Sequence, residues 1–161
     1  MSAFSNPAIP FSAFLKIDGI TTGHLNGLEL ESFSWGVSNS GTPSTGEGDI
    51  GRATFSDFTF ASAIGQQSPQ LFQKCVSGEH ISAAVLTVGG SRGVADIIIK
   101  MNDVIVSNYQ FTKHDLQKIQ DQITGKIEAG EIPTESVSLN FSKMEFSVGG
   151  TSGTGGTSGK I

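Results

Sequence analysis

The stretch "ESVSLNFSKMEFSV", from Glu135 to Val148, decides the fold, because its apolar residues alternate with polar ones as in a β-strand. The apolar residues of its first half share one parity: Val137, Leu139 and Phe141. Those of its second half share the other parity: Met144, Phe146 and Val148. Side chains two residues apart lie on the same face of a strand, so this shift moves the apolar set to the opposite face. We expect a bend near Ser142-Lys143, with the first set in a core and the second set facing a neighbouring chain.

Two other alternating stretches show the same change of parity. In "LELESFSWGVS" the parity of Leu28 and Leu30 differs from that of the aromatic residues that follow, and in "ATFSDFTFASAI" it changes between Phe55 and Phe58. Alternation also predicts strands near residues 11–17 and 80–89. The stretch "ADIIIKMNDVIVSNYQF" predicts a hairpin, because two β-branched runs flank Asn102-Asp103, which suits a two-residue turn.

A short helix is predicted over residues 68–77. Ser68 suits the N-cap, Pro69 the first helical position and Gly78 the C-cap. Its apolar residues recur at helical spacing: Leu71, Phe72, Cys75 and Val76. The stretch "TKHDLQKIQDQI" indicates a second short helix near residues 113–123, and between the two helices the chain is predicted to be β-structured.

The composition favours one domain that makes protein contacts. Charged residues are 16% of the chain, glycine occurs 21 times, and the net charge is −5 without a basic run, which argues against nucleic acid as a partner. No stretch has the ~18 apolar residues of a membrane span, and the first residues do not resemble a secretory signal peptide. We expect a loose segment at 1–10, one domain at 11–148 and a flexible glycine-rich tail at 149–161.

The sequence holds no cluster that predicts catalysis, a metal site or a cofactor. A GxGxxG pattern at residues 46–51 lies in a long polar loop, 39–52, and leads into a strand, which is the wrong context for a phosphate site. His24, His80 and His114 are scattered, and no GxSxG motif is present. The single cysteine, Cys75, is expected to be a small buried hydrophobe.

The predicted fold is mainly β, a small closed barrel or a sandwich with bent strands and the helix on its flank. Seven residues are expected in the core: Leu15, Ile17, Trp35, Phe60, Phe72, Leu139 and Phe141. Two alternatives to an assembling structural protein stay open at this point. One is a monomeric barrel that binds a small ligand, and the other is a hydrolase whose catalytic residues meet only in the fold.

Four segments carry a resemblance to a known family: "FLKIDGI", "LESFSWGVS", "SPQLFQKCVSGEHI" and "PTESVSLNFSKMEFSV". Together they resemble the Hcp family, the haemolysin-coregulated tube proteins of bacterial type VI secretion systems, and the resemblance covers residues 11–148. The chain departs from the family in the long segment 112–131, in the extra tail, and in Phe146, where tryptophan is common.

The resemblance implies a compact β-barrel of two sheets with a flanking helix, and an assembly. Members form hexameric rings that stack into a tube, which a contractile sheath expels behind a spike, and they carry secreted effectors in the ring lumen. Such a protein is in the bacterial cytoplasm before assembly and is then secreted through the type VI machinery without a signal peptide. The ring-stacking contact is expected in the long loop, at Thr42, Glu47, Asp49 and Arg52. The lateral contact between subunits is expected at Met144, Phe146 and Val148.

Overall fold

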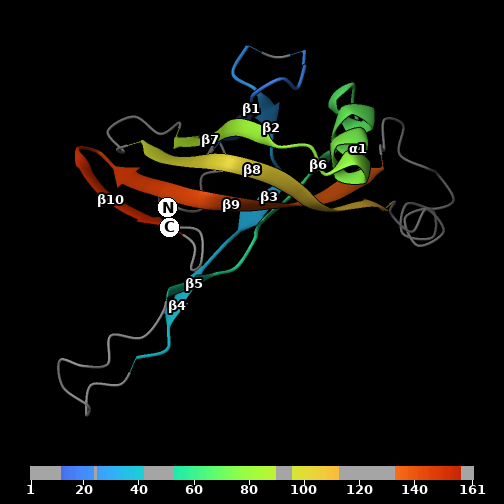
Figure 1. Ribbon diagram of the computed structural model, residues 1–161. Coiled ribbons are helices and arrows are strands. Elements are labelled where there is room, and N and C mark those ends of the chain that lie inside the picture. Colours follow the sequence, from blue (N-terminus) through green and yellow to red (C-terminus); the bar gives the residue numbers. More distant parts are fainter. Residues whose placement is uncertain (1–11, 24, 42–52, 90–95, 113–132, 157–161) are drawn as a thin grey trace, which may run out of the picture.

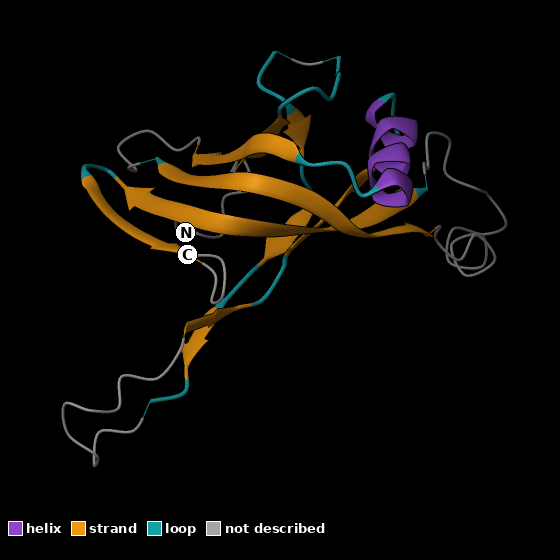
Figure 2. Ribbon diagram, viewed as in Figure 1, coloured by secondary structure: helices purple, strands orange, loops and turns teal. Residues whose placement is uncertain are grey.

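The protein is mainly β, with a helix on its flank (Figure 2), as the alternation predicts. The computed structural model describes residues 12–23, 25–41, 53–89, 96–112 and 133–156. Its main sheet is entirely antiparallel and has eight strands. Seven of them follow one another across the sheet in this order: β2 (Leu28–Glu29), β1 (Ser12–Ile17), β7 (Ile81–Gly89), β8 (Ile97–Thr112), β9 (Thr134–Val148), β6 (Phe58–Ala63) and β3 (Ser32–Ser34).

The two ends of this sheet are joined by a short piece of chain. β2 and β3, the first and last strands of the order, are separated in the sequence only by Leu30 and Glu31. The Leu30 amide donates to the Ala13 carbonyl in β1 at 2.9 Å, and the Glu31 amide donates to the Ala61 carbonyl in β6 at 2.8 Å. The segment 28–34 therefore bridges both ends of the sheet, which is the closure that a barrel needs.

The change of parity in the opening stretch is shared by three neighbouring strands. The last buried residues on one side of the change are Ile81, Val104 and Phe141, which lie opposite one another in β7, β8 and β9. The first on the other side are Ala84, Met101 and Met144, which also lie opposite one another. All six belong to one core, so the parity changes along a line across the sheet without creating a second apolar face. The expectation that Met144 faces away from the core is therefore wrong, since Met144 is only 2% exposed.

The predicted hairpin at Asn102-Asp103 is also wrong, because β8 runs straight through these residues. Met101 and Val104, on either side of them, remain paired with both β7 and β9. Asp103 instead takes a left-handed conformation, with φ +55°, inside the strand. A left-handed residue interrupts the extended backbone, and it does so where the buried parity changes.

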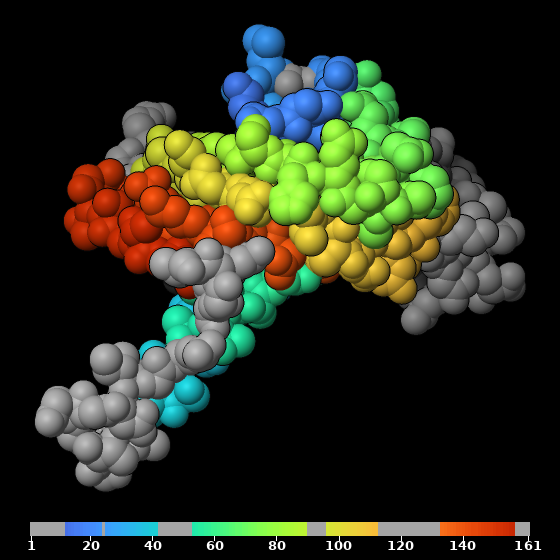
Figure 3. All heavy atoms as spheres, in the orientation of Figure 1, coloured from blue at the N-terminus to red at the C-terminus, as the bar shows by residue number. Residues whose placement is uncertain are grey.

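The other two changes of parity have a simpler cause, because each falls where one strand ends and the next begins. The change between Leu30 and Phe33 lies at the step from β2 to β3, which stand at opposite ends of the main sheet. β4 (Val37–Asn39) and β5 (Ala53–Phe55) pair with each other in a separate two-stranded sheet. Figures 1 and 3 show this pair extending away from the main body as an arm. The break between Phe55 and Phe58 is thus the step from β5 into β6.

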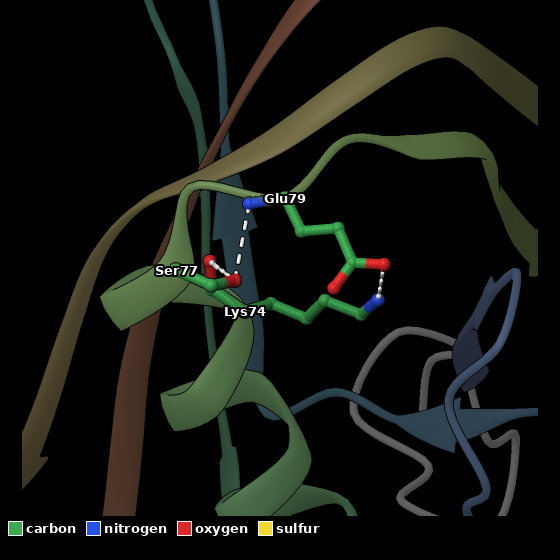
Figure 4. A network of polar contacts seen from close by, with 3 residues as sticks. All are labelled: Lys74, Ser77 and Glu79. Atoms are coloured by element: carbon green, nitrogen blue, oxygen red, sulfur yellow. Dashed lines mark hydrogen bonds and ion pairs between the residues drawn. The ribbon is translucent and has the colours of Figure 1, made fainter.

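Helix α1 (Gln67–Ser77) packs on β8, and its ends were only partly predictable. The N-cap is Gln66 and not Ser68, which lies inside the first turn, where its Oγ accepts a hydrogen bond from the Gly65 amide at 3.0 Å. Gly78 is the predicted C-cap, with φ +70°. Just beyond it, the Glu79 amide donates to Ser77 Oγ at 3.2 Å, and the Lys74 Nζ lies 3.1 Å from Glu79 Oε2 (Figure 4). This exposed ion pair contributes at most about 1 kcal/mol to stability.

The tail differs from the expectation of a flexible linker. Thr151–Gly156 form β10, which pairs antiparallel with the second half of β9, from Gly156 opposite Lys143 to Thr151 opposite Val148. The physical reason is the open edge of β9: β6 pairs with this strand only as far as Leu139, so the backbone groups beyond that point need another partner.

Most residues expected in the core lie there. Five are buried: Leu15, Ile17, Phe60, Leu139 and Phe141. Trp35 is partly buried against the core, as is Cys75 on α1. The expectation for Phe72 is wrong, because it is 53% exposed while its neighbour Leu71 is fully buried. Helix α1 thus buries a narrower stripe than the sequence indicates.

Several expectations fall on residues outside the described parts of the chain. They concern the segment 1–10, the stacking residues Thr42, Glu47, Asp49 and Arg52, the second helix at 113–123, and His24 and His114. Within the described residues, no helix is both long and apolar enough to cross a membrane.

Candidate assembly surface

An apolar surface is left uncovered at the end of β9. Phe146 and Val148 have the parity of the buried Met144, yet they are 41% and 42% exposed. The reason lies in β10, whose residues opposite them are Gly153 and Thr151. Neither residue is large enough to cover its neighbour, so the core face ends in an exposed apolar edge.

Trp35, between β3 and β4, extends this edge. Its ring meets the ring of Phe146 edge to face, with the centroids 5.5 Å apart and the planes at 83°. Aromatic pairs in this geometry contribute about 0.5–1.5 kcal/mol beyond the area that they bury. We call Trp35, Phe146 and Val148 the apolar margin. The pair with Trp35 restrains the ring of Phe146 while leaving much of it exposed.

The apolar margin differs from the opposite face of the same strands. There Lys100 lies directly opposite Glu145, and Asn102 lies opposite Lys143. Lys100, Lys143 and Glu145 are exposed, so this face is well solvated, although Ile98 is 40% exposed on it. Apolar residues at the border of a core, held by an aromatic contact, are typical of a protein contact surface.

The arm is attached to the barrel close to the apolar margin. The Phe55 ring, at the base of β5, meets the ring of the buried Phe141 edge to face at 5.5 Å. On its other side it touches β10, because a Cβ added at Gly155 would lie 3.0 Å from the Phe55 Cζ. The arm, β9 and β10 are therefore packed together at the uncovered end of the core.

A buried polar cluster attaches α1 to the barrel. The Glu135 carboxylate, which is fully buried, accepts hydrogen bonds from Ser62 Oγ at 2.9 Å and Gln67 Nε2 at 2.7 Å on one oxygen. Its other oxygen accepts one from the Tyr109 hydroxyl at 2.7 Å. Burial raises the pKa of Tyr109 to about 12, and its hydrogen bond to Glu135 and the negative charge of Glu135 act in the same direction.

The sequence analysis missed this cluster. The available signal was the parity of Glu135, which matches that of Val137 and Leu139 on the core face. A carboxylate at a core position of a strand needs buried donors. Its three partners come from β6, α1 and β8, while Glu135 itself belongs to β9. The cluster therefore holds these four elements in position and is part of the scaffold.

Of the histidines and the cysteine weighed for chemistry, His80 and Cys75 lie among the described residues. The His80 Nδ1 lies 2.6 Å from Asp103 Oδ1 in an exposed pair at the surface. Among the described residues, no three histidine, cysteine, aspartate or glutamate side chains are grouped to hold a metal ion. An apolar hollow of about 620 Å³ lies beside α1, outside the barrel, between Phe72, Tyr109 and Phe111.

The four stacking residues of the sequence analysis belong to the loop between β4 and β5, and this loop lies outside the described residues. The lateral residues are divided by the structure. Met144 belongs to the core, and Phe146 and Val148 belong to the apolar margin.

Comparison with known proteins identifies the family. Residues 14–148 match the family described as "Type VI secretion system effector, Hcp". Protein hcp1 of Pseudomonas aeruginosa is 30% identical over 92 residues, which make up 55% of this chain and 49% of that relative, so the chain aligns with about half of its length.

Two solved structures share the fold. Hcp1 from Salmonella typhimurium superposes with a TM-score of 0.67 at 24% identity, over 92% of this chain and 94% of that one. A type VI secretion system effector from Yersinia pestis has a TM-score of 0.66 at 23% identity, over 90% of this chain and 99% of that one. Because the family match spans the barrel from β1 to the end of β9, this chain belongs to the Hcp family of type VI secretion system proteins.

Proposed function

We propose that this chain is a structural subunit of the type VI secretion tube, which forms hexameric rings by contacts at the apolar margin. The observation that carries the proposal is the exposure of Phe146 and Val148, at 41% and 42%, on a face that is otherwise buried core. A family member that leaves this edge open has a surface suited to a neighbouring subunit.

A ring requires a contact between two different patches of the same chain. The apolar margin of one subunit would meet another surface of the next, and repeated rotation would close the ring. A specific contact of this kind buries about 800 Å² on each partner, so polar residues around the apolar margin would join it. The expected ring has six times the mass of the 16.8 kDa chain.

In this proposal the arm carries the contact between rings. β4 and β5 extend away from the barrel (Figure 1), and the sequence between them contains Thr42, Glu47, Asp49 and Arg52 for polar pairing. Deleting residues 42–48 should leave single rings intact and reduce the fraction of stacked rings in negative-stain images. Loss of the rings themselves would mean that the arm belongs to the lateral contact.

The stacked rings would form the tube that a contractile sheath expels behind a spike, and effectors would travel in the lumen. The chain would then act in the cytoplasm during assembly and leave the cell through the secretion machinery. Its role would be structural, without catalysis or a cofactor.

The lateral contact can be tested by placing a charge on the apolar margin. Val148→Lys and Phe146→Lys should convert rings to monomers in size exclusion with light scattering, because a buried unpaired charge is costly. Ile98→Lys is the matched control, since Ile98 is 40% exposed on the opposite face and should leave the rings intact. Far-UV circular dichroism checks that each variant folds. Intact rings with both margin variants would rule out this surface.

A further inference from the structure

β10 completes one edge of β9, where it covers the part that no other described strand pairs with. Along this edge, β6 pairs from Ala63 opposite Thr134 to Phe58 opposite Leu139. β10 then pairs with Lys143–Val148, while β8 occupies the other edge of β9 over its whole length. Figure 1 shows β10 folded back along β9 after a tight turn. Without β10, the backbone groups of Lys143–Val148 on this edge would be open to another strand.

β10 is bound weakly to this edge, but in a specific register. Half of its six residues are glycine, and none of the six is buried, so backbone hydrogen bonds provide most of the attachment. Its fit nevertheless depends on register, because Gly155, opposite Met144, lies where a Cβ would come within 3.0 Å of the Phe55 Cζ. A segment with glycine at this position fits the edge beside Phe55 as it stands, whereas a larger residue requires the Phe55 ring to move.

The turn before β10 can open without strain. It consists of Gly149 and Gly150, with Gly149 at φ +63°. If both glycines became extended, β9 and β10 would form one continuous strand. The eight residues from Gly149 to Gly156 would then reach about 26 Å beyond β9, which is far enough to meet another subunit.

We propose that β10 exchanges between copies of this chain, so that the tail strand of one subunit pairs with the Lys143–Val148 edge of the next. The occupant is a second copy because an identical tail offers the same backbone pairing and the same glycine beside Phe55. Exchange then alters little besides the turn, as in domain swapping. The exchanged strand adjoins Phe146 and Val148 of the apolar margin, so it would link two subunits where the lateral contact forms. In this form the inference rests on the proposed ring.

Disulfide trapping between different chains tests the exchange. Ser147 and Ser152 lie opposite each other in β9 and β10. Two chains are made in a Cys75→Ser background, one with Ser147→Cys and the other, carrying a tag that changes its mass, with Ser152→Cys. The chains are mixed, assembled, oxidised and separated without reductant. Exchange predicts a mixed disulfide dimer that neither chain forms to the same extent alone.

Substitutions of Gly149 in the turn give a second test of the exchange and its matched control. Gly149→Val should raise the yield of the mixed dimer, roughly ten-fold where exchange is rare, because a β-branched residue disfavours positive φ and so opens the turn. Gly149→Asn should leave the yield close to the original, since asparagine tolerates this conformation and suits a two-residue hairpin turn.

Native mass, measured on the same samples, separates this inference from the proposed ring. Rings without mixed dimers would overturn the exchange and leave the ring standing. Mixed dimers from a chain that never forms rings would support exchange and overturn the ring. Monomers that give only the intrachain disulfide in a Ser147→Cys/Ser152→Cys double variant would overturn both.

Discussion

Replacing Glu135 by alanine should destabilise the barrel strongly, although this residue has no part in the assembly surface. Two of its donors, Ser62 and Gln67, are 0% and 2% exposed, and water cannot readily replace the lost carboxylate. Gln67 Nε2 also donates to the Ala63 carbonyl at 3.0 Å, so only one of its two hydrogens loses its acceptor. Each buried N–H or O–H that loses its acceptor costs about 1–3 kcal/mol, so the two should cost about 2–6 kcal/mol. Tyr109 is partly exposed and can turn toward solvent, so its bond is left out of this sum. The loss is a large part of the ~5–15 kcal/mol that stabilises a typical domain.

The measurement is urea unfolding, followed by the fluorescence of Trp35, the single tryptophan, and by circular dichroism. Glu135→Gln is the control, because its amide oxygen can still accept from Ser62 and Gln67, and it should lose about half as much or less. If Glu135→Ala loses less than about 1 kcal/mol, the donors find other partners and the argument fails.

Two further predictions concern α1 and the polar cluster. Leu71→Ala should lower the free energy of unfolding by about 2–5 kcal/mol. Phe72→Ser should lower it by only about 0.5–1.5 kcal/mol, because the Phe72 side chain is already 53% exposed and loses mainly its edge-to-face contact with the Tyr109 ring, whose centroid is 6.2 Å away. Urea curves in which Phe72→Ser costs as much as Leu71→Ala would contradict the observed packing. The pKa of Tyr109 is raised from 10.0 to about 12, so folding favours its neutral hydroxyl; the resulting stability is complete below pH 10 and is lost as the pH rises through 12. Between pH 10 and 12, wild type should therefore lose more stability than Tyr109→Phe, and equal losses would contradict the assignment.

The strands and α1 were predictable because their patterns are local. Whether Asn102-Asp103 forms a turn or a kink was not, because a polar pair between two apolar runs suits both structures. The choice depends on β7 and β9, which pair with β8 on both sides of Asp103. The residues of β7 and β9 that decide this are distant from Asn102-Asp103 in the sequence. The changes of parity in the three strands can be recognised as one kink only when the strands are aligned.

The candidate surface was predictable only in part, for a similar reason. Alternation selects Met144, Phe146 and Val148 together, but burial depends on what lies beside each one. Met144 is enclosed by the core, and Phe146 is left exposed because Gly153 has no side chain to cover it. The composition of the tail predicts flexibility, and its pairing follows only from the open edge of β9.

The parity of the buried residues changes at neighbouring positions in β7, β8 and β9, along a line across the sheet, so the number of residues in each of these strands depends on the other two. Each of β7, β8 and β9 has two residues between its core positions on either side of this line. Deleting Asp103 alone would shift the rest of β8 by one residue and turn Val104 and Val106 out of the core. An insertion or deletion here would have to be matched in all three strands at once. In the evolution of such chains, changes of length should therefore collect in the connections between strands, while this line keeps a constant residue count.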